Sequence, residues 1–459
     1  MSIDVHSYID THQDDVLHDF IALLRIASIS ALPAHDADTQ RAAEIVAAML
    51  DTAGLQHVEI IATGGQPLVY ADWLDSPGKP TVLIYAHFDV QPVDPEDEWN
   101  SPPFTPTITG DDLVARGATD DKNQVIATIH AVSSLLAARG TLPVNIRFVF
   151  EGEEESGGEA IEAFVREHPE RLTSDIVLVA DGGMGDEGHP IVFYGCRGIL
   201  YTEIVAQGPV RDVHSGTFGG NAPNPIFALA QIITGLKDDG GHITIPGLYE
   251  LAQPITNEER TLWAPQQAPF RKTLLSEMDL TDLTGEAGFT DLERAWSRPT
   301  LEVHGIIGGF IGDGTKTVIP ATARAKVSLR LVPGQTPDNV LPLLEARVAA
   351  LTPPGIKTEV VFLNGGMPLL TDYNNAAFTA TRDTLTAVFG TATWISRAGG
   401  SVPIAATFQE VLGGTVMILG FGLTTDRAHS PDEHTSLATF YRSVHAFADV
   451  LDALGQTTV

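Results

Sequence analysis

The sequence predicts an α/β protein, in which a sheet of parallel strands has helices on both faces, and a second, α+β domain inserted into it. Strand and helix patterns alternate through residues 1–198, and the same alternation returns in 364–459. Between them, residues 199–363 instead carry strands of alternating apolar and polar residues. At 459 residues the chain is too long for one ordinary core. We therefore expect a discontinuous first domain, 1–198 plus 364–459, and an inserted domain, 199–363.

Each element of the first domain is predicted from its apolar spacing. Apolar residues at helical spacing predict helices over 12–28, 38–53 and 121–138. Short apolar runs predict strands over 57–62, 67–73, 81–86, 144–150 and 175–181. After residue 373 we expect a helix in NAAFTATRDTLTAVFG, a strand in VMILGFG and a last helix from about 435.

The inserted region has a different pattern. Alternation in ILYTEIVAQG, in 322–333 and in 356–363 predicts strands with one exposed face, as in an antiparallel sheet. The segment 238–300 is rich in Gly, Pro and acidic residues and has weak periodicity.

Composition excludes several classes of partner. The net charge of -32 argues against nucleic acid and anionic membranes. There is no apolar run long enough to span a membrane, and the polar, acidic first twenty residues do not resemble a secretory signal. Cys196 is the only cysteine, which excludes an internal disulfide and a cysteine-rich zinc site. These features predict a cytoplasmic protein.

Histidines and carboxylates follow the predicted strands of the first domain. They are His87 and Asp89 after 81–86, the acidic run 151–155 after 144–150, Asp181 after its strand, and His429 within the loop that follows VMILGFG. Asp120 and Asp121 stand just before a predicted helix. Ligand sites of open α/β sheets lie beyond the carboxyl ends of the strands, so these side chains are expected at one edge.

This set of donors points to divalent metal ions. Imidazole nitrogen and carboxylate oxygen without sulfur suit Zn²⁺, Mn²⁺ or Co²⁺. Five ligands are too many for one tetrahedral zinc with an open position, but they suit two metals that share a bridging carboxylate. Taken singly, each motif has an ordinary explanation: a helix cap, a turn residue, a solvated acidic loop or a surface histidine. Their joint placement at strand ends favours a metal site.

Ten motifs along the chain together resemble the M20 family of dinuclear metallopeptidases, and most closely its cytosolic, carnosinase-like dipeptidase branch. The motifs, in chain order, are AHFDVQP (86–92), RGATDDKNQ (116–124), FEGEEESGG (150–158), VADGG (179–183), YGCRGILY (194–201), DVHSGTFGG (212–220), KTVIP (316–320), SLRLVP (328–333), RAGGSVPIAATFQEVLGG (397–414) and AHSPDEH (428–434). The resemblance implies a zinc-peptidase-like catalytic domain with a mixed central sheet flanked by helices, and an inserted α+β domain that acts as lid and dimerisation domain.

The resemblance also implies a role for each metal-site residue. His87 and Asp181 would hold one metal, Glu155 and His429 the other, and Asp120 would bridge both. The cofactors would be two divalent ions per subunit, Zn²⁺ or Mn²⁺. Asp89 would orient the His87 imidazole, a role expected beside metal-bound histidines. The Asp120–Asp121 peptide bond is expected to be cis.

Further residues are assigned to catalysis and substrate binding by the same resemblance. Glu154 would be the general base toward a bridging water. His214 would stabilise the oxyanion, in its own subunit or across a homodimer formed through the inserted domain. Arg330 would bind the substrate carboxylate, because arginine suits a bidentate grip. Thr317, Gly400 and Ser401 would line the substrate pocket.

The sequence therefore predicts metal-dependent hydrolysis of dipeptides. The main alternative keeps the same machinery but makes the protein an N-acyl amino acid deacylase or desuccinylase. A non-catalytic member of the family is a third reading, disfavoured because Glu154 and all five ligands are present. Arg197 is expected to have a structural role near the domain junction.

Overall fold

The computed structural model describes residues 4–185 and 188–457, which form two compact units. Unit 1 comprises residues 1–195, 371–396 and 404–459, and unit 2 comprises 196–370 and 397–403. The sequence boundaries were expected at 198 and 363, with all of 364–459 in the first domain. Residues 397–403 differ from this expectation and lie in unit 2. Their loop is held there by hydrogen bonds from Arg197 and Arg330, which no local pattern indicates.

Unit 1 is built on a mixed sheet whose strand order is β1-β2-β6-β3-β7-β17-β8. The strands are β1 (Gln56–Ile61), β2 (Leu68–Trp73), β3 (Thr81–His87), β6 (Asn145–Glu151), β7 (Ile176–Val179), β17 (Thr415–Leu419) and β8 (Ile191–Cys196), with β16 (Trp394–Ala398) also paired to β8. The strands from β6 to β17 are parallel, whereas β1, β2 and β8 join antiparallel. This confirms the expected mixed sheet, and the parallel strands bring their carboxyl ends to one edge.

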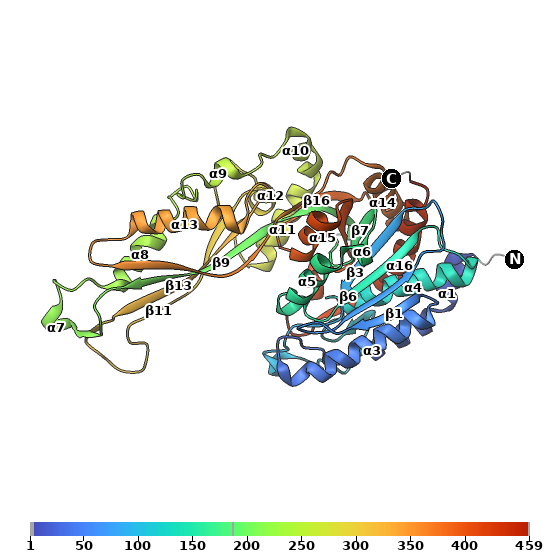
Figure 1. Cartoon of the computed structure of the whole chain (residues 1–459), viewed down its shortest axis with the longest axis horizontal. Coiled ribbons are helices and arrows are strands. Elements are labelled where there is room, and N and C mark those ends of the chain that lie inside the picture. The colour runs from blue at the N-terminus through green and yellow to red at the C-terminus, as the bar shows by residue number, and fades with distance from the viewer. Residues whose placement is uncertain (1–3, 186–187, 458–459) are drawn as a thin grey trace. The chain divides into compact units, whose positions relative to one another are not determined.

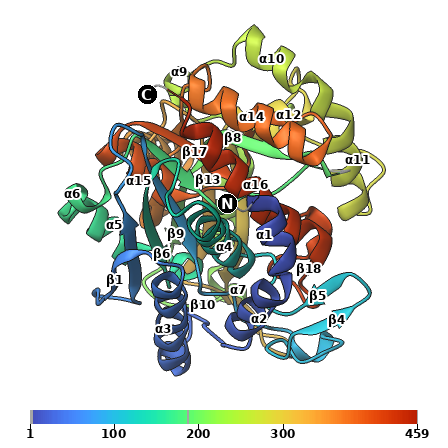
Figure 2. The same cartoon turned by 90° about the vertical axis from the view of Figure 1, so that its right-hand side faces the viewer.

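Helices cover this sheet. They are α1 (Val5–Thr11), α2 (Gln13–Leu24), α3 (Asp36–Thr52), α4 (Lys122–Arg139), α5 (Glu159–Glu167), α6 (Pro169–Leu172), α14 (Ala376–Phe389), α15 (Pro403–Leu412) and α16 (Leu437–Leu454). The central helix is α4, which packs on β3 and against α1, α2 and α16, and Figure 2 shows it among these helices. Because α4 is enclosed, its first residues, including Lys122 and Asn123, are buried. Figure 1 shows α3 running beside β1.

Two predicted elements differ from the observed ones. The helix expected over 12–28 ends at Leu24, and a separate helix, α1, precedes it. The strand expected over 81–86 includes His87, so this side chain is fixed by the sheet itself. A small sheet of order β18-β5-β4 joins the segment before α4 to the segment before α16. Its strands are β18 (His434–Ser436), β5 (Asp112–Val114) and β4 (Thr107–Thr109).

Unit 2 contains an antiparallel sheet of order β11-β13-β9-β14. The strands are β11 (Thr300–Gly308), β13 (Thr322–Leu331), β9 (Gly198–Gln207) and β14 (Lys357–Gly366). One face, with Leu200, Leu301 and Leu329, packs under α8 (Pro225–Gly235) and α13 (Pro337–Leu351) to form the core of this unit. Figure 1 shows both helices on that side of the sheet. The alternating burial of β9 and β13 agrees with the period-2 pattern of the sequence.

The weakly periodic segment 238–300 folds into short helices. They are α9 (Leu248–Leu251), α10 (Asn257–Trp263), α11 (Gln267–Glu277) and α12 (Asp291–Trp296). Capping boxes begin α10, with Thr256 and Glu259, and α12, with Thr290 and Glu293. Helices this short leave little periodicity to detect. Other short elements are α7 (Ser215–Phe218), β10 (Val213–His214), β12 (Val318–Ile319) and β15 (Leu369–Leu370). Among the described residues, none of the helices has the length and apolarity that crossing a membrane requires.

Candidate metal centre

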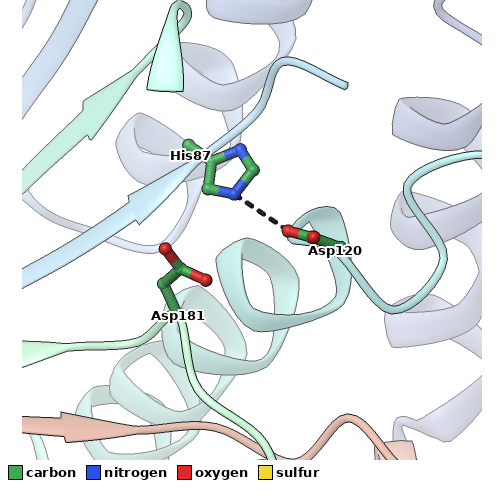
Figure 3. Close-up of side chains that lie close together, drawn as sticks. All are labelled: His87, Asp120 and Asp181. Atoms are coloured by element: carbon green, nitrogen blue, oxygen red, sulfur yellow. Dashed lines mark hydrogen bonds and ion pairs between the residues drawn. The ribbon is translucent and has the colours of Figure 1, made fainter. Parts of the chain in front are cut away.

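Two groups of metal-type donors meet at Asp120 in unit 1. One consists of His87, Asp120 and Asp181, the other of Asp120, Glu155 and His429, and within each group the ligand atoms lie within 4.8 Å of one another. Figure 3 shows the Asp181 carboxylate and the His87 ring turned toward Asp120, with His87 Nε2 lying 3.1 Å from Asp120 Oδ1. The five predicted ligands are therefore brought together, and the residue shared by the groups is the one expected to bridge.

His87 is held from both sides of its ring and from its backbone. Its Nδ1 lies 3.2 Å from the carbonyl oxygen of Asp89 and 3.4 Å from that residue's Oδ1. Its backbone N–H donates to Asp121 Oδ2. The Asp120–Asp121 peptide bond is cis, as expected from the sequence. With Nδ1 facing oxygen, the opposite nitrogen, Nε2, points to Asp120.

Asp89 also fixes the acidic loop that follows β6. Its fully buried carboxylate accepts hydrogen bonds from the backbone N–H groups of Glu154 and Glu155, at 3.2 and 3.1 Å. The Ser30 hydroxyl donates to the same carboxylate at 2.6 Å. One side chain therefore links the end of β3 to the loop that carries the predicted base and one predicted ligand.

The Asp120 loop is fixed by Glu433, a fully buried carboxylate in the loop before β18. Its Oε1 accepts from the backbone N–H groups of Thr119 and Asp120, at 2.9 and 3.1 Å. Its Oε2 accepts from the Gly117 N–H at 3.0 Å and from Arg116 Nη1 at 2.7 Å. Because His429 precedes Glu433 by four residues, this carboxylate joins the loops of two predicted ligands.

His429 and Glu155 complete the second group. His429 Nε2 lies 2.9 Å from Asp120 Oδ2 and 3.1 Å from Glu155 Oε1. The other Glu155 oxygen, Oε2, accepts from Gln91 Nε2 at 2.7 Å. His429 has a positive φ of 62°, uncommon outside glycine, and its side chain is half-exposed. This group therefore lies at the open side of the centre.

Crowding of carboxylates in a buried place governs the electrostatics of the centre. Burial, then the charges of Asp181 and Glu155, raise the pKa of Glu154 to about 9. Burial and the charges of Asp120 and Glu155 raise the pKa of Asp181 to about 6. Burial opposes ionisation of Asp120 too, but hydrogen bonds from His429 and His87 hold its pKa below its usual range. The cluster thus carries more negative charge than its histidines balance.

These properties fit divalent cations. The donor set contains only imidazole nitrogen and carboxylate oxygen, the set that suits Zn²⁺ or Mn²⁺ in a catalytic site. The buried surplus of negative charge is costly without a compensating cation. The residues of both groups therefore fit the metal ions that the sequence predicts.

Unit 2 holds the predicted substrate residues in two places. Arg330 Nη1 donates to Ser401 Oγ at 2.6 Å, and the Gly400 carbonyl accepts from the Arg197 N–H at 3.1 Å. His214 is exposed in β10, which pairs with β12, and the Thr317 carbonyl accepts from the N–H of Ser215. The two pairs lie toward opposite ends of β13, because Thr322 begins this strand and Arg330 is its penultimate residue.

Several residues of the centre were assigned no role by the sequence predictions. Glu433 stands inside the quoted AHSPDEH motif, and Asp121 and Lys122 inside RGATDDKNQ, so position in a motif was the available signal. Lys122 Nζ is buried and donates to the carbonyls of Leu23 and Ile26 at the end of α2. Ser30 has no comparable signal, because its contact with Asp89 spans 59 positions.

Comparisons with known proteins show the family of this chain. Residues 83–453 match the model of the peptidase family M20/M25/M40. The Beta-Ala-His dipeptidase of Rattus norvegicus is 33% identical over 96% of this chain and 93% of its own length. The Cys-Gly metallodipeptidase of Saccharomyces cerevisiae is 30% identical over 89% of each chain. The M20 family metallo-carboxypeptidase Sso-CP2 of Sulfolobus solfataricus has a TM-score of 0.86 and 30% identity, over 96% of this chain and 99% of its own.

The match covers most of the chain and includes all five candidate donors. Ser30 and Leu23, which contact Asp89 and Lys122, lie before the matched residues. The relatives named above are peptidases that match nearly their full lengths. The expected family and fold are confirmed, and the protein is a hydrolase. The chain belongs to the peptidase family M20/M25/M40.

Proposed function

We propose that this protein hydrolyses the peptide bond of dipeptides with two divalent cations bound at Asp120. The observation that carries the proposal is the pair of donor groups that share this one carboxylate. The dipeptidase names of the rat and yeast relatives support the substrate class. The carboxypeptidase relative supports recognition of a free C-terminal carboxylate.

His87 and Asp181 would hold one cation, Glu155 and His429 the other, and Asp120 both. When bound, Zn²⁺ or Mn²⁺ would polarise the scissile carbonyl and make water more acidic. Asp89 and Glu433 would keep the donors in position, since groups behind metal ligands orient them. The surplus of buried carboxylate charge would be balanced by the cations.

Glu154 would act as general base and then as general acid. It is half-buried beside Glu155, and Asp89 holds its backbone N–H. A carboxylate there would take a proton from the attacking water and return it to the nitrogen of the leaving amine. Arg330 would bind the substrate carboxylate, and Ser401, Gly400 and Thr317 would complete the pocket.

His214 and Arg330 cannot serve one dipeptide within a single copy of unit 2. Thr322, which follows the His214-paired strand β12, is eight positions from Arg330 along β13. At about 3.3 Å per residue this is roughly 26 Å, much longer than a dipeptide. We therefore infer a homodimer in which His214 and Thr317 of one subunit complete the site of the other, where His214 stabilises the oxyanion. Ile306, Ile307 and Ile311 are exposed on and just after the edge strand β11, and they support an interface through unit 2.

The test is a panel of dipeptides beside the corresponding N-acetyl amino acids and tripeptides, followed by mass spectrometry. The full chain is stripped with a chelator and then supplied with Zn²⁺ or Mn²⁺ separately. We expect cleavage of dipeptides only after metal is returned. Cleavage of the acetylated set alone would instead make the protein a deacylase with the same residues in the same roles.

A further inference from the structure

Unit 2 contains a hollow of about 670 Å³ on the face of its sheet opposite the core. Its floor is formed by alternate residues of three strands, among them Tyr201 on β9, Ser328 and Arg330 on β13, and Thr300 on β11. Their sequence neighbours, such as Leu200 and Leu329, point into the core. One wall is apolar and comes from α11 and the segment after it, with Leu274, Leu280 and Leu283. The hollow thus has a polar floor and an apolar side.

The charged side chains of this hollow have a surplus of two positive charges. Its five basic side chains are those of Arg197, Lys237, Arg294, Arg298 and Arg330. Its three acidic side chains each form an ion pair with one of them: Glu302 with Lys237 at 3.3 Å, Glu286 with Arg298 at 2.7 Å, and Asp291 with Arg294 at 3.2 Å. In the part of the chain that the structure describes, Arg197 and Arg330 form no ion pair. This surplus stands out in a chain of net charge -32.

The two unpaired arginines lie side by side. Arg330 pairs in the sheet with Ile199 on one side and with Thr300 on the other. Arg197 stands two residues before Ile199, yet its Nη1 lies 3.3 Å from Thr300 Oγ1, so its guanidinium reaches across the end of β13. Burial and the charge of Arg330 lower the pKa of Arg197 to about 10, which agrees with two cations in proximity.

Both guanidiniums are fixed by one short loop. Arg197 Nε donates to the Gly399 carbonyl at 2.7 Å, and Arg330 Nη1 donates to Ser401 Oγ at 2.6 Å. These hydrogen bonds use only part of the donors of each group, because a guanidinium has five N–H bonds. The remaining donors are held at fixed positions beside the hollow. A preorganised pair of this kind suits two carboxylates.

We propose that Arg197 and Arg330 form one subsite for the C-terminal residue of the substrate, and that this subsite selects residues with a second carboxylate, aspartate or glutamate. The inference rests on the proposed function, which gives Arg330 the α-carboxylate, and adds Arg197 as the partner of the side-chain carboxylate. A dianionic residue balances the surplus of two charges, whereas a neutral residue leaves one cation uncompensated. Arg197, expected from sequence to be structural, becomes a specificity-determining residue.

The test compares Ala-Glu with Ala-Gln, which have nearly the same shape and differ in charge. For the metal-loaded wild type we expect kcat/KM to be about tenfold or more higher for Ala-Glu, the effect of one charge-assisted hydrogen bond. In Arg197→Gln the ratio should fall to near one, while kcat/KM for Ala-Gln stays within about threefold of wild type. Arg197→Lys keeps the charge and should restore part of the preference.

Lys237→Gln is the matched control, because it removes a lining cation that has its own acidic partner. It should keep the preference for Ala-Glu. An equal loss for both dipeptides in Arg197→Gln would reduce Arg197 to a support of the 399–401 loop and overturn the inference. A wild-type ratio of one or less would also overturn it.

A binding measurement separates this inference from the proposed function. Isothermal titration of the metal-loaded protein with L-glutamate and L-glutamine needs no hydrolysis. We expect glutamate to bind about tenfold more tightly, and Arg197→Gln to abolish the difference. If no dipeptide is cleaved, the proposed function fails, but this difference still decides the inference. Equal affinity of wild type for both amino acids would overturn it.

Discussion

The candidate metal centre of unit 1 and the arginine pair of unit 2 are two polar sites of opposite charge in one acidic protein. In unit 1 carboxylates outnumber their basic partners, and burial raises the pKa of Glu154 and Asp181. In unit 2 the guanidiniums of Arg197 and Arg330 form no ion pair with a described acidic residue, and burial lowers the pKa of both. Each site therefore lacks the charge that its proposed ligand supplies, cations in one and carboxylates in the other.

The two sites also differ in how they are held. The metal donors come from five separate segments, and buried carboxylates that are not donors, Asp89 and Glu433, fix the loops that carry them. The arginines come from neighbouring sheet positions and are fixed by the loop 399–401, at a half-exposed surface. Substitutions in the first site should therefore abolish function, and those in the second should shift preference.

The largest effect is expected from Asp120→Ala. This change removes the carboxylate common to both donor groups, so neither group keeps three ligands. We expect loss of bound metal, measured by plasma mass spectrometry after dialysis, and activity at background. A variant that retains two metals per chain would show that Asp120 does not bridge the two donor groups.

Glu154→Gln should separate catalysis from metal binding. The amide keeps the size of the side chain but cannot take a proton, and general-base catalysis typically contributes about 10²- to 10⁴-fold. We expect kcat to fall within that range, with the metal content unchanged. Normal turnover by this variant would exclude Glu154 as the base and would leave the metal centre without an assigned proton acceptor.

Glu433→Gln should test whether the buried carboxylate positions Asp120. Its two oxygens accept four hydrogen bonds from the 116–120 segment, and an amide offers only one accepting oxygen. We expect metal affinity, measured by chelator competition, to fall about 10- to 100-fold. Glu410→Gln is the control, since Glu410 pairs with Arg166 at the surface of the same unit. Equal affinities in the two variants would confine Glu433 to a role in folding.

The two sites differ in how many of their residues could be predicted from the sequence. The sequence allowed the grouping of the five candidate donors to be predicted, because most of them follow apolar strands whose carboxyl ends share an edge. The supporting contacts were not predictable, because Ser30 and Asp89, or Glu433 and Thr119, meet only in three dimensions. The proximity of Arg197 to Arg330 was not predictable for the same reason: the two residues are 133 positions apart, and only the register of β9 with β13 brings them together.

The smallest effect is expected from Ser401→Ala, which probes how the arginine pair is held. Ser401 Oγ accepts one hydrogen bond from Arg330, and its loss frees the guanidinium to adopt other positions. A hydrogen bond to a charged group is worth about 1.5–3 kcal/mol, so KM should rise roughly tenfold or more while kcat and metal content stay unchanged. The matched substrate is a dipeptide amide, which has no C-terminal carboxylate for Arg330 to bind. Its KM should be the same in Ser401→Ala and wild type. If KM for the amide rose by the same factor, Ser401 would act on substrate binding by a route other than Arg330, and the arginine pair would not depend on this hydrogen bond.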